Sequence, residues 1–286
     1  MKRVLTAAVL IPVVLVLVFL GPKWQWLFTL AVAGIAVLAG YEYLTLTRRC
    51  GAHPPRIATL VALLALFAVN FQWPEDTPAV FGLLGLGLLV YCTFSRAVEG
   101  VMADAAASIF CMLYAGLALI ALPTLRAQPN GASLVTFLLC VIWAGDTVAY
   151  YIGRAWGRHK LAPKLSPGKS WEGAAGSIAG SLAAAGLLMA MASFEQRSDF
   201  LAMILQKWDV ATLTYPDDTW YWLVLAAIVN VAGQVGDLAE SALKRSANVK
   251  DSGSLLPGHG GVLDRIDALL LAGPVLWYAQ VMHQRF

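Results

Sequence analysis

Long apolar runs separated by short polar breaks dominate this chain. Each of nine such runs is 17 to 23 residues long, and a helix needs about 20 apolar residues to cross the hydrocarbon core of a bilayer. The breaks between them are short and rich in Pro, Gly or charge, as in Cys50-Gly-Ala-His-Pro-Pro. The pattern therefore predicts nine membrane-spanning helices, over residues 4–20, 24–46, 57–73, 79–95, 101–122, 133–152, 174–194, 219–240 and 264–283.

Composition points the same way. Hydrophobic residues make up 59% of the 286 residues and charged residues only 13%, with a mean hydropathy of +0.69, whereas soluble domains carry about 25% charged residues. We expect an all-α polytopic integral membrane protein with no separate soluble domain. Residues 1–130 would hold five spans, and residues 131–286 four spans with two polar loops, 153–173 and 241–263. The first run resembles a secretory signal but lacks a small-residue cleavage site, so we expect a retained span. The four cysteines show no CxxC spacing, and neither a disulfide nor a zinc site is expected.

The distribution of Lys and Arg predicts the orientation. With the N-terminus inside and the C-terminus outside, 15 of the 20 Lys and Arg residues fall on the cytoplasmic side, as the positive-inside rule requires. The opposite orientation would reverse this bias, so we predict N-in and C-out.

The densest cluster of charge and glycine lies between the last two apolar runs, from Ser241 to Asp267. This segment holds four cations (Lys244, Arg245, Lys250 and Arg265), three carboxylates (Asp251, Asp264 and Asp267), His259, and four glycines that include Gly258, Gly260 and Gly261. Backbone amides of a glycine-rich turn before a helix can donate hydrogen bonds to phosphate oxygens. The pattern indicates a site for a polyanion and its metal ion.

Other polar groups fall on the same predicted face. They are Asp146 near the end of the sixth run, the loop residues Ser166, Lys169, Ser170 and Glu172, and Asp237 near the end of the eighth run. Asp237, Ser241 and Lys244 share one helix face, and so do Asp264 and Asp267. Carboxylates are costly inside a membrane and usually mark a site or pathway, and two helices that each offer an Asp could bind Mg²⁺ together with substrate phosphate oxygens. Glu42 and Asp104 lie in apolar runs without such neighbours, and we expect a structural or water-facing role for them.

At this point the residues resemble a known family. The signature of phosphatidate cytidylyltransferases (CDP-diacylglycerol synthases) is similar to the run Ser241-x-Leu243-Lys244-Arg245-x4-Lys250-Asp251-x-Gly253-x2-Leu256-Pro257-x-His259-Gly260-Gly261-Val262-x-Asp264-Arg265-Ile266-Asp267. The loop Ser166 to Gly173 also resembles a family element, although the family often has Thr where this chain has Ser170. The resemblance covers about residues 140–270, and the first 130 residues match only as generic membrane helices.

The resemblance implies an enzyme that transfers the cytidylyl group of CTP to phosphatidic acid, giving CDP-diacylglycerol and pyrophosphate in phospholipid biosynthesis. It also implies Mg²⁺ as cofactor, with a second cation left open, a homodimer, and a multi-pass location in the inner membrane with the site facing the cytoplasm. The partners are then CTP, phosphatidic acid and the lipid bilayer, with no nucleic acid. In the family, the residues matching Asp237 and Asp264 bind the metal.

The remaining candidates fall into two groups. The candidate catalytic residues are Lys244, Arg245, Lys250, Asp251, His259, Arg265 and Asp267. The candidate substrate-binding residues are Asp146, Ser166, Lys169, Ser170, Glu172, Ser241, Gly258, Gly260 and Gly261.

Two other functions fit parts of the pattern. A CTP-dependent lipid kinase would need the same metal and triphosphate groups, but its substrate would attack the γ-phosphorus. A transporter would also carry acids within its spans, although mid-membrane polar sites and inverted repeats are typical of that class, and neither is visible here.

Overall fold

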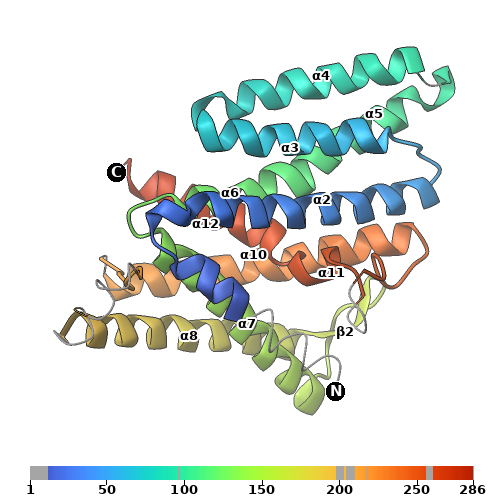
Figure 1. The fold of residues 1–286 in the computed structure, drawn as a ribbon. Coiled ribbons are helices and arrows are strands. Elements are labelled where there is room, and N and C mark those ends of the chain that lie inside the picture. Colours follow the sequence, from blue (N-terminus) through green and yellow to red (C-terminus); the bar gives the residue numbers. More distant parts are fainter. Residues whose placement is uncertain are drawn as a thin grey trace.

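In a computed structural model, residues 12–95, 97–197, 203, 210–216, 218–255 and 260–285 are described. Within them, almost all regular structure is helical (Figure 1). Residues 12–19 are helical, and the helices that follow are α2 (Gln25–Arg49), α3 (Arg56–Gln72), α4 (Thr77–Ser95), α5 (Val101–Cys111), α6 (Ala118–Arg126), α7 (Gly131–Trp156), α8 (Trp171–Arg197), α10 (Thr219–Ser246), α11 (Leu263–Ile266) and α12 (Leu269–His283). A small antiparallel hairpin of β1 (Lys160–Ala162) and β2 (Ser166–Ser170) lies between α7 and α8.

The helices confirm the predicted fold class, an all-α polytopic membrane protein. Six of them are long and apolar enough to cross a bilayer: Gln25–Arg49, Pro74–Ser95, Val98–Arg126, Gly131–Trp156, Trp171–Glu195 and Thr219–Ser246. The third and ninth predicted spans correspond to shorter helices, α3 with 17 residues and α12 with 15. Part of the first predicted span lies outside the described residues. The fifth is one continuous helix in which a π-helical segment, Met112–Leu117, joins α5 to α6.

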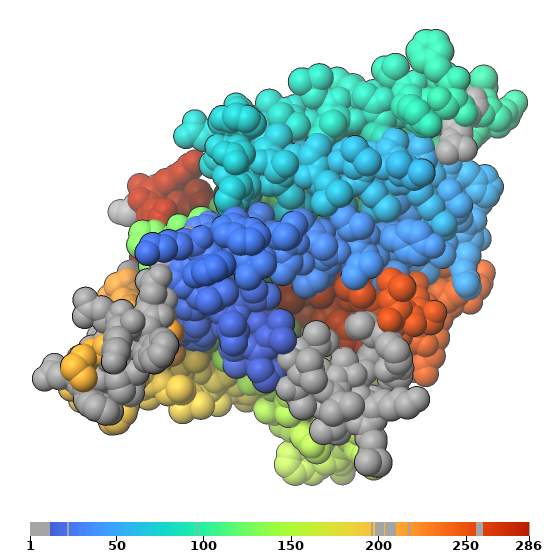
Figure 2. Space-filling view, in the orientation of Figure 1, coloured from blue at the N-terminus to red at the C-terminus, as the bar shows by residue number. Residues whose placement is uncertain are grey.

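The long helices run roughly side by side (Figure 1). α4, α3 and α2 lie in succession along one side, α6, α10 and α12 occupy the middle, and α8 lies along the opposite edge. Figure 2 shows the same succession on the surface, from α4 through α3 and α2 to α8. Most side chains of α4 are exposed, which suits a helix that faces lipid.

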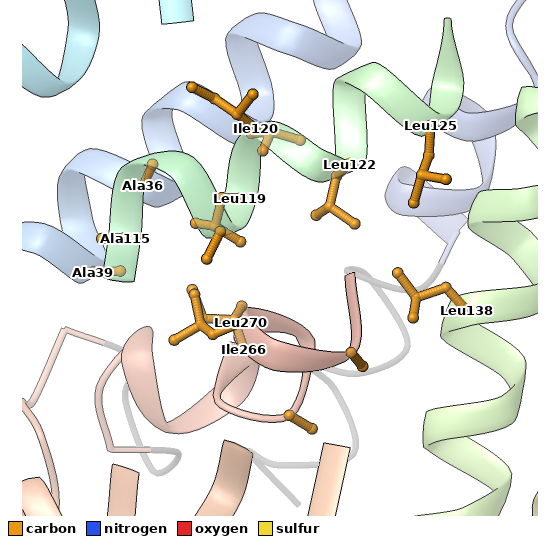
Figure 3. Close-up of a cluster of buried hydrophobic side chains, with 14 of the residues drawn as sticks. Ala36, Ala39, Ala115, Leu119, Ile120, Leu122, Leu125, Leu138, Ile266 and Leu270 are labelled. Atoms are coloured by element: carbon orange, nitrogen blue, oxygen red, sulfur yellow. The ribbon is translucent and has the colours of Figure 1, made fainter. Parts of the chain in front are cut away.

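The centre of the molecule is a cluster of small and aliphatic side chains (Figure 3). Leu119 and Leu122 of α6 lie between the alanines Ala36 and Ala39 of α2 and the chain that enters α12. Because small residues let helix backbones approach closely in a membrane, this core brings α2, from the first part of the chain, next to the last helices.

Three loops that were predicted on one side of the membrane meet at one end of the bundle (Figure 1). The Sγ atom of Cys50, after α2, lies 3.9 Å from the Oγ atom of Ser246, at the end of α10. Arg245 donates a hydrogen bond of 3.3 Å to the carbonyl of Leu165 in the hairpin. The polar loops of the chain therefore form one continuous surface there.

Candidate active site

A cavity of about 600 Å³ opens between α7, the hairpin, α8 and α10. Apolar and glycine positions make up part of its wall. Its polar lining consists of Asp146, Tyr150, Arg154, Lys169, Ser170, Ser177, Gln234 and Asp237. Four predicted site residues from α7, the hairpin and α10 thus share one cavity, namely Asp146, Lys169, Ser170 and Asp237.

An ion pair crosses this cavity. The Nζ atom of Lys169 lies 2.7 Å from Oδ2 of Asp237, and both side chains are partly exposed. Asp237 also accepts a 3.5 Å hydrogen bond from Ser241, one turn further along α10. Asp146 lines the same cavity. Two carboxylates and a lysine are therefore present in its wall.

The hairpin that carries Lys169 is closed at its base by two residues. His159 Nδ1 lies 2.6 Å from Oε1 of Glu172, and the backbone amide of His159 points at both oxygens of the same carboxylate. Ser170 is buried, and its Oγ accepts a hydrogen bond from the amide of Gly173 in the first turn of α8. Ser166 pairs with Ala162 across the two strands, outside the cavity lining. Ser166, Ser170 and Glu172 thus shape the loop that presents Lys169.

A second group of charges lies one turn further along α10. Lys244 Nζ is 2.5 Å from Glu240 and 2.7 Å from Asp264. Glu240 is fully buried and Lys244 nearly so. Since a buried charge needs a partner, Lys244 connects α10 to the chain segment that begins α11.

Asp264 is the most heavily hydrogen-bonded carboxylate at this end. It accepts hydrogen bonds from Lys244, from the amide of Ser252 and from the amide of Gly261 at 2.7 Å. The hydroxyl of Ser252 has one proton to share between Asp264, at 3.0 Å, and Glu42, at 2.9 Å. Asp264 lies outside the six long spans. Burial opposes its ionisation, but the Lys244 ammonium and the amides of Gly261 and Ser252 lower the pKa of its carboxyl below the usual value. It is therefore an ionised anchor for the glycine-rich loop.

Glu42 of α2 is the residue that the sequence did not assign to this region. It is only 2% exposed, and it accepts hydrogen bonds from Ser252 Oγ (2.9 Å), Val262 N (3.0 Å) and Leu263 N (2.8 Å). A Cβ atom at Gly261 would come within 2.3 Å of its Oε2, so only glycine fits there. Of the two roles expected for Glu42, its burial and three hydrogen bonds agree with the structural one, but the expectation that it lies apart from the polar Ser241–Asp267 segment was wrong. No local signal identifies its partners, because they lie more than 200 residues away in the sequence.

Asp104 differs from Glu42. It is also buried, and it accepts a 2.5 Å hydrogen bond from the amide of His53. It therefore holds the loop between α2 and α3, in agreement with the structural role predicted for it.

The remaining predicted residues lie around the glycine-rich loop. Four of them are exposed, namely Arg245, Lys250, Asp251 and Arg265. Gly260 and Gly261 begin the described stretch 260–285. His259 and Gly258 lie outside the described residues. Three cations, Arg245, Lys250 and Arg265, are thus exposed at the protein surface.

The donor set fits a hard divalent cation that is shared with a substrate. Within the described part of the chain, no three carboxylate, histidine or cysteine side chains are grouped to hold an ion unaided. Mg²⁺ is usually bound by one or two carboxylates, with waters and substrate phosphates completing the shell. Asp237 and Asp146 both line the cavity and offer such oxygens there. Both oxygens of Asp264 are engaged by Lys244, Ser252 and Gly261 in this structure.

Comparisons with known proteins agree along the whole chain. Residues 1–283 match the model of the "Cytidylyltransferase family". A phosphatidate cytidylyltransferase of Brucella abortus is 36% identical over 279 residues, covering 96% of this chain and 91% of that protein. The phosphatidate cytidylyltransferase of Haemophilus influenzae is 33% identical, with 97% of each chain covered. The phosphatidate cytidylyltransferase of Bacillus subtilis is 32% identical, and the match covers 97% of this chain and 96% of that protein. The similarity thus includes the N-terminal helices as well as the charged loops, and the chain belongs to the cytidylyltransferase family.

Proposed function

We propose that this protein transfers the cytidylyl group of CTP to phosphatidic acid, releasing pyrophosphate and leaving CDP-diacylglycerol in the membrane. The observation that carries the proposal is the cavity in which Lys169 and Asp237 face each other at the polar end of a membrane helix bundle. A soluble nucleotide and a lipid headgroup have to meet at such a cavity for the transfer to occur. The relatives named phosphatidate cytidylyltransferase support the same substrates.

The reaction needs little acid–base help. A phosphate monoester has a second pKa of about 6 and is mostly dianionic at neutral pH, so its oxygen can attack without a general base. A new P–O bond forms to the α-phosphorus of CTP, the bond between that phosphorus and the bridging oxygen breaks, and pyrophosphate leaves with the electron pair. The protein must therefore align two polyanions and neutralise their charge.

The chain's own residues divide these tasks. Lys169, now paired with Asp237, turns to a phosphate oxygen when the nucleotide enters. Arg245, Lys250 and Arg265 meet the outer phosphates or the lipid phosphate, and Lys244 keeps Asp264 and Glu240 in place. Asp237 and Asp264 would hold Mg²⁺, and the ion would supply positive charge to the phosphate oxygens. Ser170 and Glu172 fix the hairpin so that Lys169 keeps its position.

The cellular setting follows from the substrates and the cations. Because CTP is a soluble anion and the Lys and Arg residues favour the N-in orientation, the site opens to the cytoplasm, and the protein is a multi-pass component of the inner membrane. We also propose that it is a homodimer, as the family resemblance implies. Native mass spectrometry in detergent tests this, and a purely monomeric species contradicts it.

The direct test is an assay with purified protein, phosphatidic acid, Mg²⁺ and CTP labelled at either the α- or the γ-phosphate. Label from the α position must appear in the extracted lipid, and label from the γ position must appear in pyrophosphate. A lipid labelled from the γ position would instead identify a lipid kinase. No labelled lipid with either nucleotide, from protein that is folded and inserted, would refute the proposal.

A further inference from the structure

A chain of uncharged polar side chains extends from the cavity into the membrane part of the bundle. Ser181 donates a 2.7 Å hydrogen bond to the carbonyl of Val141, and Asn230 Nδ2 donates to Ser181 (2.7 Å) and to Ser177 (2.9 Å). Gln234 Nε2 donates to Asn230 Oδ1 at 2.7 Å and to the carbonyl of Ala174 at 3.3 Å. Asn230, Ser177 and Ser181 are each at most 2% exposed.

The hydrogen bonds of this network can run in only one direction, from donor to acceptor. A backbone carbonyl can only accept, so the single hydroxyl proton of Ser181 is used on Val141, and Ser181 must accept from the amide nitrogen of Asn230. Asn230 Oδ1 then faces Gln234, which must turn its own nitrogen toward it. The carbonyl of Ala174 also accepts from Nε2 of Gln234, so it independently requires the same orientation of the Gln234 amide. Both N–H groups of Gln234 are therefore used inside the protein.

One end of this hydrogen-bond network faces the cavity. Gln234 and Ser177 both line it, and Gln234 lies three residues before Asp237 on α10, about 4.5 Å along the axis. No residue that the structure describes donates to Oε1 of Gln234, so this oxygen is an acceptor left for a ligand. Ser177 already accepts from Asn230, which leaves its hydroxyl proton to donate. The inner end of the cavity thus presents one fixed acceptor and one donor.

We infer that Gln234, with Ser177, selects the cytosine base of the nucleotide. This rests on the proposed function, which places the phosphates at Lys169 and Asp237 and leaves the base one turn deeper. Cytosine carries an amino donor at C4, where uracil and thymine carry a carbonyl acceptor. Its adjacent ring nitrogen accepts, whereas that of uracil donates. An acceptor at Gln234 and a donor at Ser177 therefore match cytosine and oppose uracil on both atoms.

The residues between Val141 and Gln234 act by positioning. Without Ser181 or Asn230, the amide of Gln234 would keep only the longer 3.3 Å hydrogen bond to the carbonyl of Ala174, and its orientation would be less firmly fixed. Gly145 of α7 leaves room for this arrangement, since a Cβ atom there would lie 2.4 Å from Asn230 Nδ2 and 2.7 Å from Ser181 Oγ. Close helix packing and base selection thus depend on the same side chains.

Equilibrium binding of CTP and UTP to the full-length protein in detergent tests the inference without requiring turnover. The wild-type protein should prefer CTP. Gln234→Met, nearly equal in size but without the acceptor, should lower CTP affinity by roughly 10- to 100-fold and should not lower UTP affinity, because the acceptor that opposes uracil is gone. Ser177→Ala, which leaves Gln234 in place, should also reduce the CTP-to-UTP ratio, and it remains informative if Gln234→Met fails to insert. Gln280→Met is the matched control, because Gln280 is buried in α12 and donates to Tyr221 rather than lining the cavity.

Equal binding of both nucleotides by the wild-type protein would overturn the inference. So would a Gln234→Met variant that loses affinity for CTP and UTP in equal proportion, since that would indicate a packing role. Selective CTP binding without CDP-diacylglycerol synthesis would refute only the proposed function.

Discussion

Every group that Glu42 contacts in the glycine-rich loop is a hydrogen-bond donor. The hydroxyl of Ser252 and the amides of Val262 and Leu263 all point at its two oxygens. A carboxylate satisfies three donors, whereas an amide has one oxygen and would turn an NH₂ group toward at least one of them. The same Ser252 hydroxyl also contacts Asp264. The position of a proposed metal ligand is thus determined in part by a residue in α2.

Glu42→Gln should therefore weaken the site while leaving the protein inserted. We expect the Mg²⁺ concentration for half-maximal activity to rise by about 10- to 100-fold, as for other groups that orient metal ligands. Amide hydrogen exchange at Val262 and Leu263 should speed up as well, independently of activity. Asp104→Asn is the matched control, since it removes a buried carboxylate that holds the amide of His53 instead. Equal effects of the two substitutions would show that Glu42 only stabilises the fold.

Asp237 is the carboxylate that the cavity and the family resemblance both single out. Asp237→Asn keeps the size of the side chain but removes the charge opposite Lys169. We expect kcat/KM to fall by about 10²-fold or more, with the amount of inserted protein unchanged. Titration with Mg²⁺ in the steady-state assay is the measurement, and near-normal activity would remove Asp237 from the proposed metal site.

At the scale of elements, the close approach of α7 to α8 and α10 positions the cavity. Gly145 is the contact point, because added side-chain atoms there would overlap with Asn230, Ser181 and Ser177. Gly145→Ala should destabilise the protein by about 1–3 kcal/mol, the usual cost of overpacking, and should lower CTP affinity.

The measurement is thermal unfolding in detergent combined with nucleotide binding. Gly34→Ala provides the control, since no atom lies within 4 Å of a Cβ atom built at that position of α2. If Gly145→Ala leaves both the unfolding temperature and CTP binding unchanged, the helices can separate without affecting the cavity.

For the whole molecule, orientation in the membrane is the main open prediction. Cys50 is exposed and lies beside Ser246 at the end that holds the site, whereas Cys92 and Cys111 are buried. A membrane-impermeant maleimide should therefore label Cys50 in inside-out vesicles and leave it unlabelled in intact spheroplasts.

Lys23→Cys in a Cys50→Ser background should give the reverse result, because residue 23 lies at the other end of α2. Labelling of Cys50 in spheroplasts would contradict the N-in orientation and a cytoplasmic site.

Features set by neighbouring residues in the sequence could be predicted, whereas contacts between residues far apart in the sequence could not. The helices were predictable because a bilayer requires long apolar segments, and the Lys and Arg residues correctly grouped the loops around Ser246 and Leu165. The hairpin was not predicted, since Ser166-Pro-Gly-Lys-Ser lacks the alternation that marks a strand. The partners of Glu42 and the direction of the Asn230 network could not be predicted either, because both arise from contacts between distant helices.

The hydrogen bonds that Glu42 of α2 accepts from Ser252, Val262 and Leu263 also have a consequence for biosynthesis. A ribosome makes Glu42 early and Leu263 some 221 residues later, so the acid stays without these donors while most of the protein is being translated and threaded into the lipid. A nascent chain that stops short of α11 can insert its helices but lacks the amides of Val262 and Leu263 that donate to Glu42. Expression of fragments that end before residue 260 should thus yield protein that resides in the bilayer and makes no CDP-diacylglycerol.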